Sequence, residues 1–350
     1  MLDLAVIYSD LFKKHEMDKA HPESPLRLDE MMKAFTKIKE ESKYSIDFFD
    51  PEPIEEENIL SVHVPDHIAK IRAISQAGGG AITIDTTLNE HTYDIAKLSA
   101  GATKQAVDIV DQNKAQRSFA VVRPPGHHAE FNSAGGFCYF NNVAIAAEWL
   151  IQYKGYNRVA IIDIDHHFGN GTSHIFYHRK DVFYISLHAH PNYSYPGSGF
   201  PIEIGVVEGK GYNVNVALLP GIKSMDWLKA LIFSMNIVRQ YKPEFILVSV
   251  GFDSLAGDPV GVMSVGSNAF YGAGYLLNEI AQECCEGKIA CTLEGGYKLD
   301  QLEDVTSKFI LGLLGNRPYI LDKLEETETS EHTASMLKQV RKALIAHWRF

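Results

Sequence analysis

The stretch that decides the fold is "RVAIIDIDHHFGNGT", Arg158 to Thr172. A short apolar run passes directly into a loop of aspartate, histidine, asparagine and glycine. A strand that is apolar on both faces is typical of a parallel sheet covered by helices on both sides. In such a sheet, the loop after the strand lies at the carboxyl edge, where ligands bind. The stretch therefore predicts a buried strand that delivers polar side chains to a site.

The same succession of apolar run and polar loop recurs along the chain. Longer segments with helical periodicity lie between the runs, and this alternation predicts an α/β fold, an open, doubly wound, mostly parallel sheet with helices on both faces. We expect strands at Leu4–Tyr8, Ser118–Val122, Arg158–Asp163, Val182–Leu187, Asn213–Leu218, Phe245–Val250 and Lys288–Leu293. We expect helices at Leu26–Glu41, Thr92–Gln112, Asn142–Tyr153, Ser224–Gln240, Ser267–Glu283, Leu299–Leu314 and, after the acidic stretch "LEETETSEH", His332–His347.

The organisation predicted for the chain is a single domain over residues 1–350. The distinctive motifs lie between about residues 21 and 315, and the last helix covers about 332–347. No linker or internal repeat interrupts this range. The glycine-rich stretch "AGGGAITIDTT", Ala77 to Thr87, is expected to be a surface loop.

Composition narrows the class of protein. The formal net charge is −11, from 33 basic and 44 acidic residues, which argues against a nucleic-acid partner. No apolar stretch approaches the ~20 residues that cross a bilayer, and the N-terminus "MLDLAVIYSD" does not resemble a signal peptide, so no membrane partner is expected. The cysteines fit no zinc-knuckle spacing, and we interpret them as reduced thiols of a cytoplasmic protein: Cys138, Cys284, Cys285 and Cys291.

Polar loops rich in histidine, aspartate, glycine and proline follow five of the expected strands. Because the carboxyl ends of parallel strands face one edge of the sheet, these loops should converge on a single crevice. They are "RPPGHHAE" (Arg123–Glu130), "DIDHHFGNGT" (Asp163–Thr172), "HAHPNYSYPGSG" (His188–Gly199), "GFDSLAGDP" (Gly251–Pro259) and "EGGY" (Glu294–Tyr297).

Asp165, His167 and Asp253 form a candidate metal site. Residues two apart in an extended segment point to the same side, so Asp165 and His167 would face the crevice together, and Asp253 would join them from another strand. Two carboxylates and one imidazole leave positions open on a divalent ion, as in catalytic sites. Zinc is the first expectation, and iron or cobalt fits the same ligands. The alternative for each aspartate alone is a loop-capping role.

The adjacent His127 and His128, after two prolines and a glycine, have two interpretations. They are either structural loop residues or a pair of acid/base groups beside the metal, where water becomes acidic. In the second interpretation Asp163 orients His127 and Asn170 orients His128. Because only Asp163 adds charge, we expect His127 to stay cationic and His128 to act as base and acid.

Tyr297 follows two glycines at the end of an expected strand. A phenol at this edge would donate a hydrogen bond to a developing oxyanion opposite the metal. The alternative is a tyrosine that only packs.

These stretches, taken together, resemble the histone deacetylase and acetylpolyamine amidohydrolase superfamily, and they are similar to its bacterial and class II-like members. The resemblance implies the arginase/deacetylase fold. It rests on these motifs, in the order in which they occur along the chain: "HPESPLR" (His21–Arg27), "RPPGHHA" (Arg123–Ala129), "GGFCYFNN" (Gly135–Asn142), "DIDHHFGNGT" (Asp163–Thr172), "ISLHAH" (Ile185–His190), "YPGSG" (Tyr195–Gly199), "GFDSLAGDP" (Gly251–Pro259) and "LEGGY" (Leu293–Tyr297).

The resemblance implies a zinc-dependent amidohydrolase with a role for each matching residue. The zinc ligands would be Asp165, His167 and Asp253, and the catalytic residues His127, His128 and Tyr297, with Asp163 and Asn170 behind the histidines. The acyl-lysine tunnel would be lined by Gly136, Phe137 and Tyr195, and Arg27 would lie at the acetate channel. Structural K⁺ ions would bind at Asp163, Asp165, His167, Ser186 and Leu187, and at Phe176, Arg179, Val182 and Tyr212.

The chain departs from the family pattern at two places. Phe168 replaces a histidine that is not a metal ligand, so activity should survive. Val260 occupies the position of an acidic gatekeeper in polyamine-selective relatives, which disfavours strict polyamine specificity. The leading prediction is therefore hydrolysis of acetylated or short-acylated lysine in peptides or proteins. The alternatives are an acetylpolyamine or other small N-acylamine amidohydrolase and, more remotely, a binuclear manganese ureohydrolase or a silent binding module. A homo-oligomer is compatible with the sequence.

Overall fold

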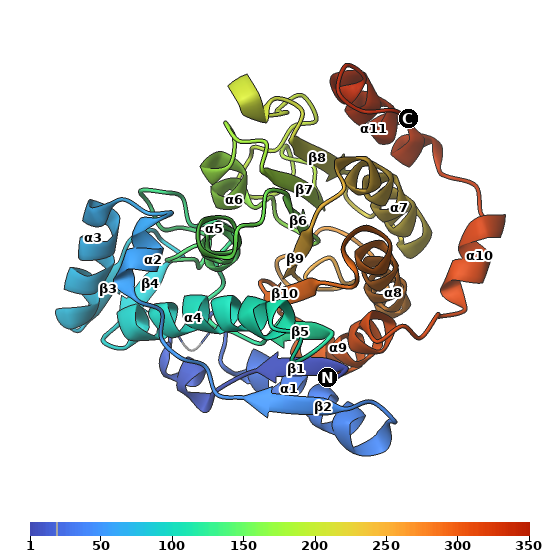
Figure 1. Cartoon of the computed structure of the whole chain (residues 1–350). Helices are drawn as coiled ribbons and strands as arrows, with labels where there is room; N and C mark the ends of the chain where they lie inside the picture. Colours follow the sequence, from blue (N-terminus) through green and yellow to red (C-terminus); the bar gives the residue numbers. More distant parts are fainter. Residues whose placement is uncertain (19) are drawn as a thin grey trace.

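The computed structural model describes residues 1–18 and 20–350. Its centre is an eight-stranded sheet in the order β2-β1-β5-β10-β9-β6-β7-β8 (Figure 1). Every neighbouring pair in this sheet is parallel, which confirms the predicted α/β class. The strands are β1 Leu4–Ile7, β2 Ile46–Phe49, β5 Arg117–Ala120, β6 Val159–Asp163, β7 Val182–Ala189, β8 Asn213–Leu218, β9 Phe245–Val250 and β10 Ile289–Leu293.

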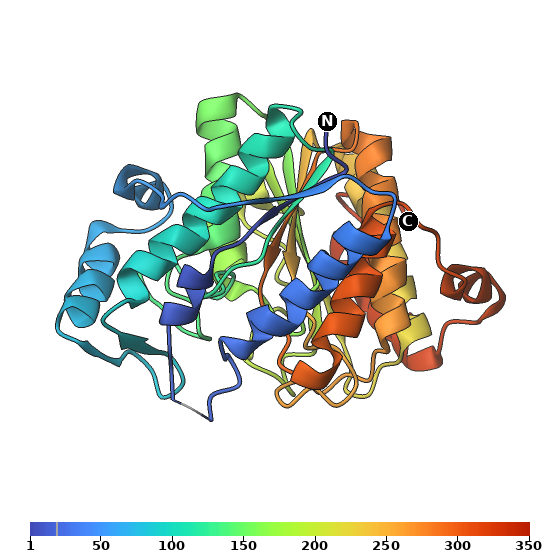
Figure 2. The same cartoon turned by 90° about the horizontal axis from the view of Figure 1, so that it is seen from below.

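Helices cover both faces of the sheet (Figures 1 and 2). One face packs against α4 Thr92–Asp111, α5 Asn142–Lys154 and α6 Asn170–Ile175. The other packs against α1 Leu26–Glu41, α7 Ser224–Tyr241, α8 Ser267–Cys285 and α9 Leu299–Leu313. The peripheral helices are α2 Glu56–Leu60, α3 Pro65–Gln76, α10 Ile320–Glu326 and α11 Glu331–Leu344, with short 3₁₀ turns η1 Asp10–Lys14 and η2 Val207–Gly209.

Burial explains the apolar runs in the sequence. Every residue of β6, β7, β8, β9 and β10 is buried, because helices cover both sides of these strands. The edge strand β2 is different: only Ile46 is fully buried, and the next three residues are exposed or half-buried. This explains why its short sequence "IDFF" gave no strand signal.

Several predicted boundaries were wrong. The expected surface loop Ala77–Thr87 contains β3, Gly79–Ala81, which pairs antiparallel with β4, Thr87–Asn89. The close pairing of the two backbones excludes a side chain at Gly79, since a Cβ there would lie 2.3 Å from the carbonyl oxygen of Leu88. Part of the acidic stretch "LEETETSEH" belongs to α10, and the last helix runs over Glu331–Leu344 rather than to His347. The short helices α2, α3, α6 and α10 and the strand β2 were not predicted.

The chain reverses its winding direction between β6 and β9, which are neighbours in the sheet. From β6 the chain passes through α6 to β7, whereas from β9 it passes through α8, on the opposite face, to β10. At such a point the two connections diverge and leave a crevice at the carboxyl ends of the strands. The loops after β5, β6, β9 and β10 therefore surround one crevice.

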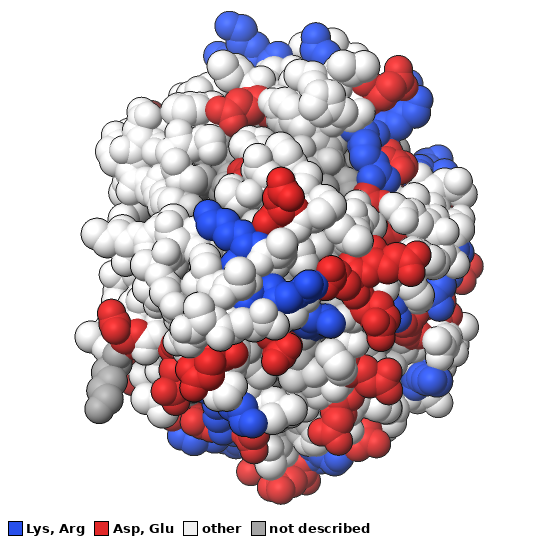
Figure 3. Space-filling model, turned by 90° about the vertical axis from the view of Figure 1, so that its left-hand side faces the viewer, with Lys and Arg blue, Asp and Glu red and all other residues white. Residues whose placement is uncertain are grey.

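Charged side chains of both signs lie on the surface of the protein. On the face that Figure 3 shows, acidic and basic side chains are interspersed among broad uncharged areas. Among the described residues, no helix combines the length and the apolar character that crossing a membrane requires.

All four cysteines are free thiols, as predicted: Cys138, Cys284, Cys285 and Cys291.

Candidate active site

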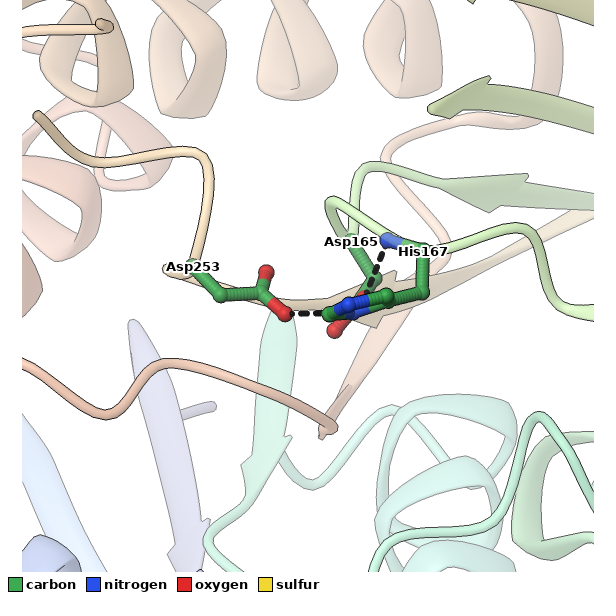
Figure 4. Close-up of side chains that lie close together, drawn as sticks. All are labelled: Asp165, His167 and Asp253. Carbon is green, nitrogen blue, oxygen red and sulfur yellow. Dashed lines mark hydrogen bonds and ion pairs between the residues drawn. The ribbon is translucent and has the colours of Figure 1, made fainter. Parts of the chain in front are cut away.

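Asp165, His167 and Asp253 lie together at the switch point between β6 and β9 (Figure 4). One ligand atom from each residue lies within 4.8 Å of the others. The His167 Nδ1 atom is 3.3 Å from Asp165 Oδ1 and 3.0 Å from Asp253 Oδ2. Within residues 1–18 and 20–350, this is the one set of three such side chains with this spacing. The three residues predicted as metal ligands are thus brought together.

The charges of this set fit a divalent cation. Burial and the neighbouring Asp165 carboxylate raise the pKa of Asp253 to about 7, and the hydrogen bond and charge of His167 offset this rise only in part. Burial alone would also raise the pKa of Asp165, but His127 and His167 lower it. A doubly charged ion between the two carboxylates would remove this conflict. Two oxygens and one nitrogen suit zinc, iron or cobalt.

The first glycine of "EGGY", Gly295, lies against the candidate metal ligands, where there is no room for a side chain. A Cβ atom at this position would lie 2.4 Å from Asp253 Oδ2 and 2.6 Å from Asp165 Oδ2. The bare backbone instead approaches the carboxylates, and its N–H donates a hydrogen bond of 2.7 Å to Asp165 Oδ2. Any side chain at Gly295 would therefore displace both candidate ligands.

The adjacent His127 and His128 each have the partner that the sequence predicted. The Nδ1 atom of His127 lies 3.0 Å from Asp163 Oδ2, and that of His128 lies 2.8 Å from Asn170 Oδ1. Both rings are buried, and their centroids are 4.0 Å apart. The Oδ2 atom of Asp163 also accepts a hydrogen bond of 2.9 Å from the Tyr184 hydroxyl. The pair is therefore held from behind by two different acceptors, one charged and one neutral.

The two histidines differ in proton affinity. Burial alone would lower the pKa of His127, but the carboxylates of Asp163, Asp165 and Glu294 raise it to about 10. Burial, followed by the charges of His127 and His167, lowers the pKa of His128 well below its usual value. The direction agrees with the sequence prediction of a cationic His127 and a neutral His128.

Tyr297 is fixed from two sides. Its backbone N–H donates a hydrogen bond of 2.7 Å to Asp258 Oδ2, and the Arg27 guanidinium lies 4.7 Å from the centre of its ring. Arg27 is fully buried and also donates to the main-chain oxygens of Gly296, at 2.6 Å, and Glu294, at 2.5 Å. The residue predicted for the acetate channel thus lies directly behind the tyrosine.

Charged groups that the sequence analysis missed support this region. Glu23 accepts from Arg27 at 2.9 Å and from two nitrogens of Arg123 at 2.5 and 2.7 Å. The Oε2 atom of Glu294 accepts from the backbone N–H groups of Gly126, at 2.7 Å, and His127, at 3.1 Å. Glu23 forms ion pairs with two buried guanidinium groups, and Glu294 anchors the backbone of the histidine pair.

A cavity of about 300 Å³ opens onto this cluster. All four residues predicted to bind substrate line it: Gly136, Phe137, Tyr195 and Val260. His128 contacts the Tyr195 ring edge-on at 4.9 Å between centroids, and Phe137 contacts Tyr297 at 5.9 Å. His128 and Tyr297 also line the cavity. The remaining lining residues are Asp85, Pro125, His127, His167, Tyr193, Ser194 and Gly295.

Residues predicted to bind potassium lie on both sides of β7. Asp163 and Ser186 are register partners in the sheet, with Leu187 next to Ser186 and Asp165 and His167 in the loop after β6. In the second set, the N–H of Arg179 donates to the main-chain oxygen of Phe176 at 3.0 Å. Val182 starts β7, and the main-chain oxygen of Tyr212 accepts from Tyr184 at 2.9 Å.

Phe168, where the family pattern has histidine, is buried and packs 4.8 Å from the His188 ring, between centroids. This position adds no polar group to the cavity.

The chain matches the family model of the histone deacetylase domain over residues 21–313. A probable deacetylase of Archaeoglobus fulgidus is 32% identical over 92% of this chain and 89% of its own length. A histone deacetylase-like amidohydrolase of Pseudomonas aeruginosa is 35% identical over 78% of this chain and 72% of its own length. The crystal structure of the HDA15 HD domain superposes with a TM-score of 0.89 at 31% identity, covering 99% of this chain and 96% of that one. The chain therefore belongs to the histone deacetylase family of hydrolases.

Proposed function

We propose that the protein is a zinc-dependent amidohydrolase that removes acetyl or other short acyl groups from acylated lysine side chains. One observation carries this proposal: a single cavity is lined by His128, Tyr297 and His167, and His167 belongs to the Asp165–His167–Asp253 set. Such a site combines an acid/base group, an oxyanion donor and metal ligands, as amide hydrolysis requires.

Asp165, His167 and Asp253 would hold the ion. When bound, a zinc ion supplies Lewis acidity, which makes water nucleophilic at neutral pH and polarises a carbonyl. The hydrogen bond between Gly295 and Asp165 orients one of the carboxylates before any ion is present.

His128 accepts the proton of the attacking water at its Nε2 atom, because its Nδ1 atom is engaged by Asn170. It later donates that proton to the departing amine, because an imidazole can act first as a base and then as an acid near neutral pH. Tyr297 donates its phenolic proton in a hydrogen bond to the oxygen of the tetrahedral intermediate. His127, kept cationic by Asp163, stabilises the same negative charge electrostatically.

Phe137 and Tyr195 restrict the substrate to a slim apolar chain that carries the amide. Val260 adds an apolar wall, so this position offers no counter-charge to a polyamine. This favours acyl-lysine in peptides or proteins over the alternative, an acetylated small amine.

Potassium ions would stabilise the loops on either side of β7 without entering the chemistry. The first would use Asp163, Asp165, His167, Ser186 and Leu187, and the second Phe176, Arg179, Val182 and Tyr212, largely through main-chain oxygens. The sheet register that pairs Asp163 with Ser186 supports the first of these.

Acetate release distinguishes the candidate functions. The panel contains acetyl-lysine peptides, free acetyl-lysine and acetylated polyamines, each assayed with the chelated protein and after addition of Zn²⁺, Fe²⁺ or Co²⁺. We expect turnover of the peptides, its loss on chelation, and its return with added metal.

Turnover of acetylated polyamines alone would replace the acyl-lysine proposal by the small-amine alternative. Urea release by protein containing two manganese ions per chain would indicate a ureohydrolase. If none of the added metals produces turnover of any substrate, the protein is a catalytically silent binding module.

Asp163→Asn should lower kcat by ~10–100-fold, the usual effect of removing a carboxylate behind a catalytic imidazole. Because Asp163 is the main charge that raises the His127 pKa, the variant should lose the His127 proton at lower pH. Because the cationic form stabilises the intermediate, the alkaline limb of the kcat profile should move to lower pH. The measurement is kcat against pH, up to about 10, in excess KCl.

Tyr184→Phe is the matched control, since it removes another hydrogen bond to the same Asp163 oxygen and leaves the charge in place. Its alkaline limb should stay at the wild-type pH. An unmoved limb in Asp163→Asn would contradict the electrostatic role of His127.

A further inference from the structure

A chain of hydrogen bonds runs from the cavity to the protein surface behind His128. The Nδ2 atom of Asn170 donates to Glu130 Oε1 at 2.6 Å, while its Oδ1 atom faces His128 Nδ1. On its far side, Glu130 is 2.8 and 3.0 Å from the Nδ1 atom of His174. The Glu130 side chain is 18% exposed and that of His174 is 45% exposed. Neither Glu130 nor His174 was among the residues for which the sequence predicts a role.

The oxygen and the NH₂ group of the Asn170 side-chain amide are nearly equal in size, but the oxygen accepts hydrogen bonds and the NH₂ group donates them. A carboxylate accepts and cannot donate, so Glu130 requires that the NH₂ end of Asn170 faces it. The oxygen end must then face His128, whose Nδ1 atom becomes the donor. In the neutral ring this leaves Nε2 without a proton, and Nε2 is the atom that takes a proton from water in the proposed function.

We propose that Glu130 is a positioning residue for the reaction: by fixing the Asn170 amide it selects the tautomer of His128 that can act as a base. Without Glu130, the Asn170 amide could turn either its oxygen or its NH₂ group toward His128, so it would not select one tautomer. Its NH₂ group has another acceptor in the main-chain oxygen of His128, but at 3.5 Å that bond is at the limit of hydrogen bonding. A flipped amide would present NH₂ to Nδ1 and place the imidazole proton on Nε2. This inference rests on the proposed function.

Removing the carboxylate tests the role directly. In Glu130→Ala, kcat should fall by ~10–100-fold, the range for groups that orient a catalytic or ligating imidazole, with unchanged KM and metal content. Glu130→Gln is the matched conservative variant. Its amide has the same size but can donate as well as accept, so it fixes the Asn170 amide less strictly, and its kcat should lie between those of Glu130→Ala and the wild type.

Exchanging the acid and the amide gives a sharper test. Asn170→Asp alone puts a second carboxylate 2.6 Å from Glu130, so kcat should fall through mutual repulsion of the charges. In the double variant Glu130→Gln, Asn170→Asp, the glutamine amide donates to the new carboxylate, which accepts from His128. We expect this double variant to have a higher kcat than Asn170→Asp.

A spectroscopic readout separates this inference from the proposed function. The ¹⁵N shifts of the His128 ring, assigned by comparison with His128→Gln, report which nitrogen carries the proton, whether or not any substrate is turned over. We expect a proton on Nδ1 in the wild type and a shift toward Nε2 in Glu130→Ala. The same tautomer in both proteins, a wild-type kcat in Glu130→Ala, or a double variant no better than Asn170→Asp would overturn the inference. Absence of turnover with an intact tautomer difference would instead count against the proposed function alone.

Discussion

His128→Ala is expected to lower kcat by ~10²–10⁴-fold, the contribution of a positioned acid/base group, while the protein keeps its metal. His128 donates from Nδ1 to Asn170 and directs its other nitrogen to the cavity, and it is not one of the three candidate ligands. The low pKa of this buried imidazole keeps it neutral and available as a base. The measurement combines kcat, KM and metal content per chain.

His127→Ala is the natural comparison, because the two rings are neighbours and equally buried. We expect a smaller loss of kcat there, since a cation that stabilises charge acts at longer range than a proton carrier. The reverse order would exchange the roles of the two histidines. Loss of metal from His128→Ala would place this residue in the ligand set.

Tyr297→Phe is expected to lower kcat by ~10²–10³-fold, the usual effect of removing one oxyanion donor. The ring should stay in place without its hydroxyl, because Arg27 packs on its face and Asp258 binds its backbone. Metal content and thermal stability should therefore remain near those of the wild type.

A trifluoroacetyl substrate provides the internal control for Tyr297→Phe. Its electron-poor carbonyl forms a more stable oxyanion, so the variant should lose less activity with this substrate than with acetyl-lysine. Equal losses with both would indicate that the hydroxyl acts on binding or packing. A variant with full activity would remove Tyr297 from the mechanism.

The central sheet could be predicted from the sequence because its buried strands are continuously apolar. β6 and β9 show this most clearly: each is followed, two or three residues later, by an aspartate of the candidate metal set. Once the strands are known to be parallel, the rule that loops after them share an edge is enough to bring Asp165, His167 and Asp253 together. The edge strand β2 had no such signal, because helices do not enclose it.

The buried charges behind the site could not be predicted in this way. The Glu294 carboxylate binds the backbone at Gly126, 168 positions earlier, and Glu23 binds Arg123, 100 positions later. Such a carboxylate is stable inside a protein only when its partners surround it, and nothing in the local pattern reveals them. Glu130 was overlooked for the same reason: its importance depends on which end of the Asn170 amide it contacts.

The ion-paired layer formed by Glu23, Arg27 and Arg123 has a consequence for the limits of a functional fragment. None of its members meets the reacting atoms, yet Arg27 supports both the Tyr297 ring and the backbone that precedes it. A shortened protein that starts after α1 would retain the aspartates and histidines of the central strands. It would, however, leave the buried Arg123 without its carboxylate partner and would uncover the surface behind Tyr297 that Arg27 occupies. Competence for hydrolysis is thus a property of the N-terminal helix as much as of the loops that carry the recognisable motifs.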